Sequence, residues 1–345
     1  MIMKILKLNL VRSLLAAGLL TLPLPAANGA QTESDLIAVL ESGVAAVQKC
    51  EACQKLRLVG TARAVPALAA LLNDERVSQA ARFALEALPA PEADVALREA
   101  LGKTSGLLQA GVVDSIGWRR DASAVPLLEP LLTHPDPTIA RAAAAALGRI
   151  GGPQALHALN AARTSIAAAA RPALFEALLR CAEQLLAEGK TAPARPVFES
   201  LAQPAEPEEV RVAAHAGLIR CAGDQALARI KSALEGPDPA AQVAALQLAG
   251  SLQGSEATAV FTGLLPTSPP AMQVALLALL RTRGDAAALP AAQAALRSPD
   301  PPVRVAALAA LGELGDAGSV PMLAEAATSR DALEQRAARQ ALESL

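Results

Sequence analysis

A segment that recurs along the chain limits the possible fold more than any other feature of this 345-residue sequence. Residues 134–151 read HPDPTIARAAAAALGRIG, and residues 298–315 read SPDPPVRVAALAALGELG. The pairs Leu289-Pro290 and Val320-Pro321 lie 31 residues apart, and the Pro-Asp-Pro triplets at Pro237 and Pro299 lie 62 residues, or two periods, apart. A fixed period of this size is typical of repeat proteins, in which each unit packs only against its neighbours.

Each repeat reads as two helices separated by a Pro-Asp-Pro turn. In the unit that starts at Asp285, the first helix ends before SPDP, because a residue that precedes proline disfavours the α conformation. The second helix starts at Pro302 and ends at Gly315, and its apolar residues share one broad face. Neither helix can bury that face alone, so we expect stacked hairpins to supply the core of an all-α fold.

The composition agrees with packed helices and excludes one class of partner. The apolar residues are mostly alanine and leucine, with no tyrosine, one tryptophan and four phenylalanines, which suits closely packed helices. The 31 basic and 33 acidic residues nearly balance, so we expect no nucleic-acid partner.

The first thirty residues have the features of a secretory signal peptide. Lys4, Lys7 and Arg12 precede an apolar run over residues 13–25 that is too short to span a membrane, and small residues follow it. We therefore predict a signal peptide over 1–30 and an exported protein, periplasmic or extracellular. No later segment is continuously apolar, so we expect no stable membrane insertion after cleavage.

The repeat pattern resembles the HEAT repeats, particularly the short subgroup first noted in the phycobilisome lyases. The shared features are D-x-x-x-V-P-x-L followed by P-D-P-x-V-R-x-A-A-x-x-A-L-G-x-L-G. The resemblance implies a right-handed α-α superhelix of about nine units over 60–345, whose second helices line the concave side. Residues 31–59 precede the first clear unit and are expected to form a helical cap. A nine-residue excess near 182–195 marks a bend, or else a projecting binding element.

The four cysteines fall into two groups. Cys50 and Cys53 form a C-x-x-C pair, but Gln54 stands where attached haem would need a histidine, and no second pair offers further metal ligands. In an oxidising compartment we expect a disulfide between them, and the alternatives are a redox-active pair or free thiols. Cys181 and Cys221 occupy a column that other units fill with Ile150 or leucine, so we expect them in the core.

The sequence offers no catalytic or metal-binding set. One HEAT-like enzyme group, the deoxyhypusine hydroxylases, binds two irons through His-Glu dipeptides, but His134, His157 and His215 are not followed by glutamate. His215 aligns with a core leucine and is expected to lie in or near the core. No nucleophile elbow, phosphate-binding loop or zinc motif occurs, so we predict neither an enzyme nor a cofactor.

Two further columns have structural explanations. Asp136, Asp238 and Asp300 each lie between prolines ahead of a helix, where a carboxylate can accept bonds from free backbone N–H groups. The resemblance implies that a second column stacks beside acids of adjacent units, and its members are Arg171, Arg211 and Arg304.

One column is less easily explained by the fold. The residue before the last core position of the second helix is Trp118, Arg149, Arg180 and Arg220 in consecutive units. Tryptophan and arginine are enriched at interaction hot spots, although arginine near a helix C-terminus also favours the helix dipole. We predict a non-catalytic exported scaffold that binds a protein partner on its curved surface. The alternatives are a lyase-like accessory factor that handles a tetrapyrrole or other prosthetic group on a client protein, and a thiol redox module at Cys50 and Cys53.

Overall fold

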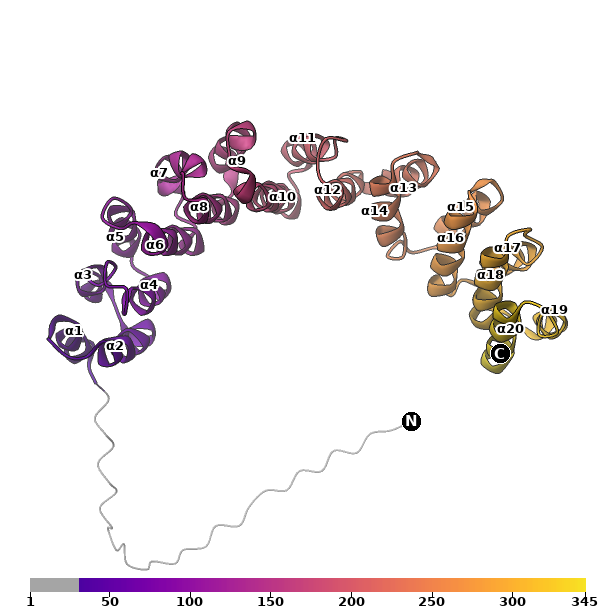
Figure 1. Cartoon of the computed structure of the whole chain (residues 1–345), viewed down its shortest axis with the longest axis horizontal. Coiled ribbons are helices and arrows are strands. Elements are labelled where there is room, and N and C mark those ends of the chain that lie inside the picture. The colour runs from indigo at the N-terminus through magenta and orange to yellow at the C-terminus, as the bar shows by residue number, and fades with distance from the viewer. Residues whose placement is uncertain (1–30) are drawn as a thin grey trace, which may run out of the picture.

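The helices of this protein follow one another along an arc. The structure, a computed structural model, describes residues 31–345, which contain twenty α-helices and no β-strand. Along the chain the helices alternate between the outer and the inner side of the arc (Figure 1). The prediction of an all-α solenoid is therefore confirmed, and its second helices line the concave side. The predicted signal peptide, residues 1–30, lies outside the described residues.

Ten hairpins make up the arc, each with one outer and one inner helix. The outer helices are α1 (Glu33–Glu41), α3 (Val65–Ala69), α5 (Pro91–Leu101), α7 (Val125–Leu128), α9 (Gly152–Ala161), α11 (Thr191–Leu201), α13 (Ala226–Glu235), α15 (Ser255–Leu264), α17 (Leu289–Ala295) and α19 (Val320–Ala326). The inner helices are α2 (Ala46–Val59), α4 (Ser78–Ala87), α6 (Gly106–Arg119), α8 (Pro137–Ile150), α10 (Arg171–Ala187), α12 (Glu208–Arg220), α14 (Pro239–Ala249), α16 (Pro270–Arg283), α18 (Pro301–Leu314) and α20 (Ala332–Ser344).

Short 3₁₀ turns precede or extend several of these helices. They are η1 (Ala62–Ala64), η2 (Ala122–Ala124), η3 (Glu129–Thr133), η4 (Ala162–Thr164), η5 (Ala168–Ala170), η6 (Gly223–Gln225), η7 (Leu265–Thr267), η8 (Ala286–Ala288) and η9 (Ala317–Ser319). The recurring Val-Pro or Leu-Pro pair follows such a turn, as at Val65-Pro66 and Val125-Pro126, and starts an outer helix. Proline is tolerated there because its missing N–H would have no partner in the first turn.

Two of the three predicted aspartate caps are confirmed and one is wrong. Asp136 accepts a hydrogen bond from the Thr138 backbone N–H at 2.8 Å, and Asp238 accepts one from Ala240 at 3.1 Å. That bond holds the pKa of Asp136 below its ordinary value. The side chain of Asp300 accepts no such bond in the structure, because the equivalent residue two positions on is Pro302, which has no N–H to donate.

The predicted arginine column is confirmed at two of its three positions. Arg211 pairs with Asp238 of the next unit, and Nε of Arg304 donates to Glu334 at 2.8 Å. Arg171 forms no ion pair with any residue of the range 31–345, so the prediction is wrong at this position.

A second set of arginines ties the end of one inner helix to the next unit. Arg119, in the last turn of α6, donates to the carbonyl oxygens of Leu85 at 2.7 Å, Leu88 at 2.8 Å and Ala90 at 3.0 Å. Arg283 makes the same type of contact at the end of α16, donating to Ala249 at 3.1 Å. These guanidinium groups satisfy carbonyls that the preceding helix leaves without a partner at its C-terminus.

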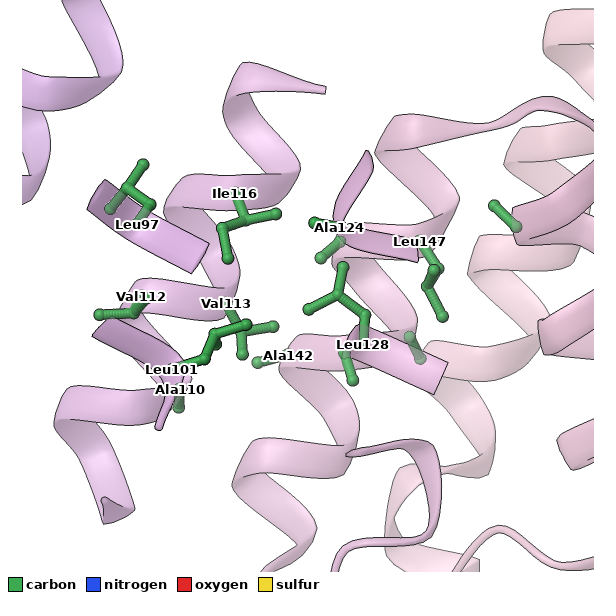
Figure 2. Packing of buried hydrophobic residues seen from close by; sticks show 14 of the residues in the cluster. Leu97, Leu101, Ala110, Val112, Val113, Ile116, Ala124, Leu128, Ala142 and Leu147 are labelled. Carbon is green, nitrogen blue, oxygen red and sulfur yellow. The ribbon is translucent and has the colours of Figure 1, made fainter. Parts of the chain in front are cut away.

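Alanine, leucine and glycine allow successive inner helices to pack closely. Figure 2 shows Leu97 and Ile116 of one hairpin and Leu128 and Leu147 of the next, and all four are fully buried. A Cβ atom on Gly148 would lie 2.7 Å from the Ala177 Cα, so α8 and α10 come together only because position 148 lacks a side chain. Gly117 and Gly312 make the equivalent approach to the next inner helix.

The apolar core consists of two parts that meet in α12. The first cluster of buried residues extends from Leu36 to Cys221, and the second begins at Ile219 and extends to Ala341. The inner helices up to α12 are seen nearly end-on in Figure 1, whereas α14 to α20 are seen from the side. The direction of stacking therefore changes near the boundary between the two clusters.

Candidate functional site: the inner ladder

The predicted column forms one row across consecutive inner helices. Its members lie two positions after a buried leucine or isoleucine in α6, α8 and α10, and the same spacing from Leu56 and Leu85 extends the row into α2 and α4. We call this row the inner ladder, and its first six members are Leu58, Ala87, Trp118, Arg149, Arg180 and Arg220. Leu58 is 86% exposed and Trp118 is 64% exposed, which is unusual for large apolar side chains.

Trp118 and Arg149 are in direct contact. The guanidinium carbon of Arg149 lies 5.1 Å from the centroid of the Trp118 ring, within the range of a cation–π interaction. Nη1 of Arg149 also donates to a carboxylate oxygen of Asp114 at 3.2 Å. Gly117 lets α8 approach α6, because a Cβ there would lie 2.6 Å from the Ala146 Cα. The exposed indole is therefore held in place by a ring contact and a close helix pair.

The other two predicted arginines are arranged differently. Arg180 is exposed and forms no ion pair with any residue that the structure describes. Arg220 donates to Glu183 of α10 at 2.9 Å, but both side chains remain about half exposed, so this pair contributes little stability. The structure thus joins Trp118 to Arg149, whereas Arg180 and Arg220 share only the ladder with them.

A partly buried polar network lies next to the ladder and was not predicted. Nη1 of Arg82 donates to the Gly111 carbonyl at 2.9 Å and to Ser115 at 3.2 Å, and the Ser115 hydroxyl donates to Glu86 at 2.7 Å. Burial raises the pKa of Glu86 above its ordinary value, although Ser115 and Arg82 act in the opposite direction. The one feature of the sequence that could have indicated this network is Gly111, a glycine inside a helix. A Cβ at that position would lie 2.6 Å from the Arg82 guanidinium.

Two more exposed apolar side chains accompany the ladder at its N-terminal end. Phe83 on α4 is 42% exposed and Leu107 on α6 is 79% exposed. With Leu58 and Trp118 they form a set that we call the apolar end of the inner side. Val47 and Val59 of α2 are exposed as well. Single exposed apolar residues are common, but several on three consecutive inner helices are typical of a surface that another molecule covers.

The cysteines are thiols in the structure. Cys50 is half-buried and directs its Sγ to the Arg76 carbonyl at 3.6 Å, while Cys53, one turn later in α2, is fully buried. Burial raises the pKa of Cys53 to about 12, so little reactive thiolate forms at neutral pH. The predicted disulfide stays a prediction. Cys181 and Cys221 are buried, and burial raises the pKa of Cys181 to about 11.

The histidines lie apart from one another. Nε2 of His215 lies 2.9 Å from Asp238, and the side chain is mostly buried, which confirms a near-core histidine with a polar partner. Nδ1 of His134 accepts the Asp136 backbone N–H at 3.0 Å, and His157 lines a cavity. Within 31–345, no group of three or more histidine, cysteine or acidic side chains is placed to hold a metal ion.

The insertion contributes to the lining of a cavity between α9 and α10. It lengthens α10 to Ala187, and the turn to α11 follows. A cavity of about 480 Å³ lies beside it and includes Arg120, Leu156, His157 and Leu185 in its lining. Arg120 has a φ of 54°, which makes it the one non-glycine residue of the described range with left-handed backbone.

None of the helices in residues 31–345 combines the length and the apolar character that a membrane span requires.

Comparisons with known proteins agree with this geometry. A family model described as HEAT repeats matches residues 95–179 and 263–343. No match was found among curated protein sequences.

Among solved structures, one of Kap95p with RanGDP is similar at a TM-score of 0.53 and 14% identity, covering 91% of this chain and 50% of that one. A structure of the karyopherin Kap121p bound to the extreme C-terminus of the protein phosphatase Cdc14p is similar at a TM-score of 0.51 and 15% identity, covering 90% of this chain and 41% of that one. The chain thus spans half or less of the karyopherins it matches. Residues 95–179 and 263–343 contain HEAT repeats, and the described chain has the fold of a HEAT-repeat solenoid.

Proposed function

We propose that this protein is an exported, non-catalytic scaffold that binds a protein partner along the inner side of its arc. The observation that carries the proposal is the exposed indole of Trp118, held against Arg149 on the concave row of helices. A partner that covers this indole gains both apolar burial and a less hydrated cation–π pair. Solenoids commonly bind along such concave surfaces, because the repeats present side chains in rows.

The arrangement of the fold supports binding rather than chemistry. Its exposed aromatic and cationic side chains are spread over successive helices, and a catalytic site would need reactive groups within hydrogen-bond reach of one substrate. A thiol redox function is not favoured, because the buried Cys53 thiol has a raised pKa and a redox-active cysteine needs accessible thiolate.

Site-specific crosslinking tests where the partner binds. A benzophenone amino acid at position 118 is expected to crosslink a protein of the native compartment on illumination. The same group at Leu127, an exposed residue of the outer helix α7, is the matched control and should crosslink little. Equal yields at both positions, or none at position 118, would contradict binding along the inner side.

Export is tested separately. When the full chain is produced in a host with a secretory pathway, the protein outside the cytoplasm should lack about thirty N-terminal residues, the usual length of a signal peptide. Intact mass and N-terminal sequencing measure the cleavage point. An uncleaved protein confined to the cytoplasm would refute the export proposal.

A further inference from the structure

The inner and outer helices carry opposite charge. The ten inner helices contain 16 lysines and arginines against 10 aspartates and glutamates, whereas the ten outer helices contain 4 basic against 10 acidic residues. The inner helices therefore carry a formal charge of +6 and the outer helices −6, within a whole chain of formal charge −2. This separation is invisible in the total charge, because it appears only when residues are sorted by the side of the arc on which their helix lies.

Part of the inner positive charge is available to a ligand. Arg141, Arg180 and Arg281 lie on three different inner helices, are exposed, and form no ion pair among residues 31–345. Other basic groups of the inner helices are already paired with acids: Arg119 pairs with Asp94 of its own hairpin, and Arg211 pairs with Asp238 of the next unit. The available cations are thus spread along the arc instead of gathered in one patch.

The apolar end of the inner side adds a second chemical requirement. Leu58, Phe83, Leu107 and Trp118 are exposed on α2, α4 and α6. The inner net charge comes from α2, α8 and α16, each of which carries a formal charge of +2. A ligand complementary to the whole row needs apolar side chains at one end and carboxylates along its length.

We infer that the inner side binds an extended acidic protein segment that inserts apolar side chains at the end marked by Trp118. This inference rests on the proposed scaffold function and names the chemistry of its partner. Packed helices lie roughly 8–10 Å apart, so ten of them span about 80 Å, or about 24 residues of extended chain. Acidic residues every few positions would meet the spread cations and be repelled by the outer side.

A nucleic acid fits the same row less well. Its phosphates are closely spaced and tight binding needs many clustered cations, whereas this row carries single arginines on separate helices. One exposed tryptophan also gives no stack of aromatic rings for successive bases. An acidic peptide with intervening leucines matches both the charge spacing and the apolar end.

Trp118 is the single tryptophan of the chain, and the chain has no tyrosine. Fluorescence excited at 295 nm therefore reports on Trp118 alone, and a ligand that covers the indole can be detected directly. The probe is a 20-residue peptide of four Glu-Ser-Leu-Glu-Gly repeats, and its matched control carries lysine in place of each glutamate. We expect the glutamate peptide to shift Trp118 emission to shorter wavelength in a saturable manner. We expect its affinity to fall at least tenfold between low and physiological salt, and the lysine peptide to bind at least tenfold more weakly.

Charge variants locate the site. The triple variant R141Q/R180Q/R281Q should weaken the glutamate peptide at least tenfold, and R229Q/K231Q on the outer helix α13 should change affinity less than twofold. Circular dichroism of both variants controls for folding. Equal binding of the two peptides, unchanged affinity in the triple variant, or tighter binding of a single-stranded DNA of equal length would overturn the inference. If the glutamate peptide fails while the benzophenone at position 118 still captures a protein, the acidic chemistry is wrong and the scaffold function stands.

Discussion

Replacing Gly148 with alanine should destabilise the solenoid although alanine is the better helix former. The substitution alone gains about 1 kcal/mol of helix propensity. However, the new Cβ would lie 2.7 Å from the Cα and 2.8 Å from the Cβ of Ala177, well inside the ~3.5–4.0 Å of ordinary carbon contact. Both contacting atoms are fixed to the α10 backbone, so α8 and α10 must separate, and overpacking of this kind costs about 1–3 kcal/mol. We expect a net loss of up to about 2 kcal/mol relative to the wild type, and of about 1–3 kcal/mol relative to a glycine-to-alanine change without the clash.

The matched control is Gly263 in α15, where a Cβ would meet nothing within 4 Å. Gly263→Ala keeps the propensity gain without the clash, so it should be neutral or stabilising by up to about 1 kcal/mol. Urea unfolding followed by circular dichroism at 222 nm measures both variants. A Gly148→Ala protein that is as stable as the Gly263→Ala protein would refute the argument that glycine is needed for close packing of the inner helices.

Three further predictions test other features of the fold. Arg119→Ala should lower the free energy of unfolding by about 2–3 kcal/mol, as measured by urea unfolding. Arg119→Lys should restore little of that stability, because one ammonium group cannot replace the several charge-assisted hydrogen bonds of a mostly buried guanidinium group. The pKa of Glu86 is raised in the folded protein, so the contribution of Glu86 to stability falls as the pH rises from the ordinary glutamate pKa through the folded-state pKa. Glu86→Gln should therefore stabilise the protein at pH 7 and lose that advantage near pH 4. Urea unfolding of both proteins at the two pH values measures this. After reduction, iodoacetamide at pH 8 should label Cys50 before Cys53, because the Cys53 pKa of about 12 leaves roughly one thiol in ten thousand ionised at that pH. Equal labelling of the two cysteines, measured by peptide mass spectrometry, would contradict this.

The aspartate caps show how a sequence pattern can be right in general and wrong at one residue. Asp136, Asp238 and Asp300 share the same Pro-Asp-Pro setting, but only the first two have a donor two positions later. Pro302 is visible in the sequence, and the loss of its N–H is a local property. The missing cap at Asp300 therefore follows from the sequence alone.

The polar network at Arg82 illustrates the opposite case. Arg82, Glu86 and Ser115 are ordinary residues for helices and come from two different units, so nothing local marks them as partners. Their contact depends on how far α4 and α6 slide past each other and on the space left by Gly111. The same holds for the contact between Trp118 and Arg149, whose shared column was predicted but whose ring-to-guanidinium approach was not.

The sequence by itself determined the repeating hairpin, its helix boundaries and its stacking, because these follow from proline, glycine and the spacing of apolar residues within about 31 positions. Only the tertiary structure decided where the stacking changes direction near α12, and it showed that the inner helices are basic in sum while the outer helices are acidic. Summed along the chain, the positive and negative charges nearly cancel. The difference in charge between the two sides appears only when alternate helices are placed on opposite sides of the arc.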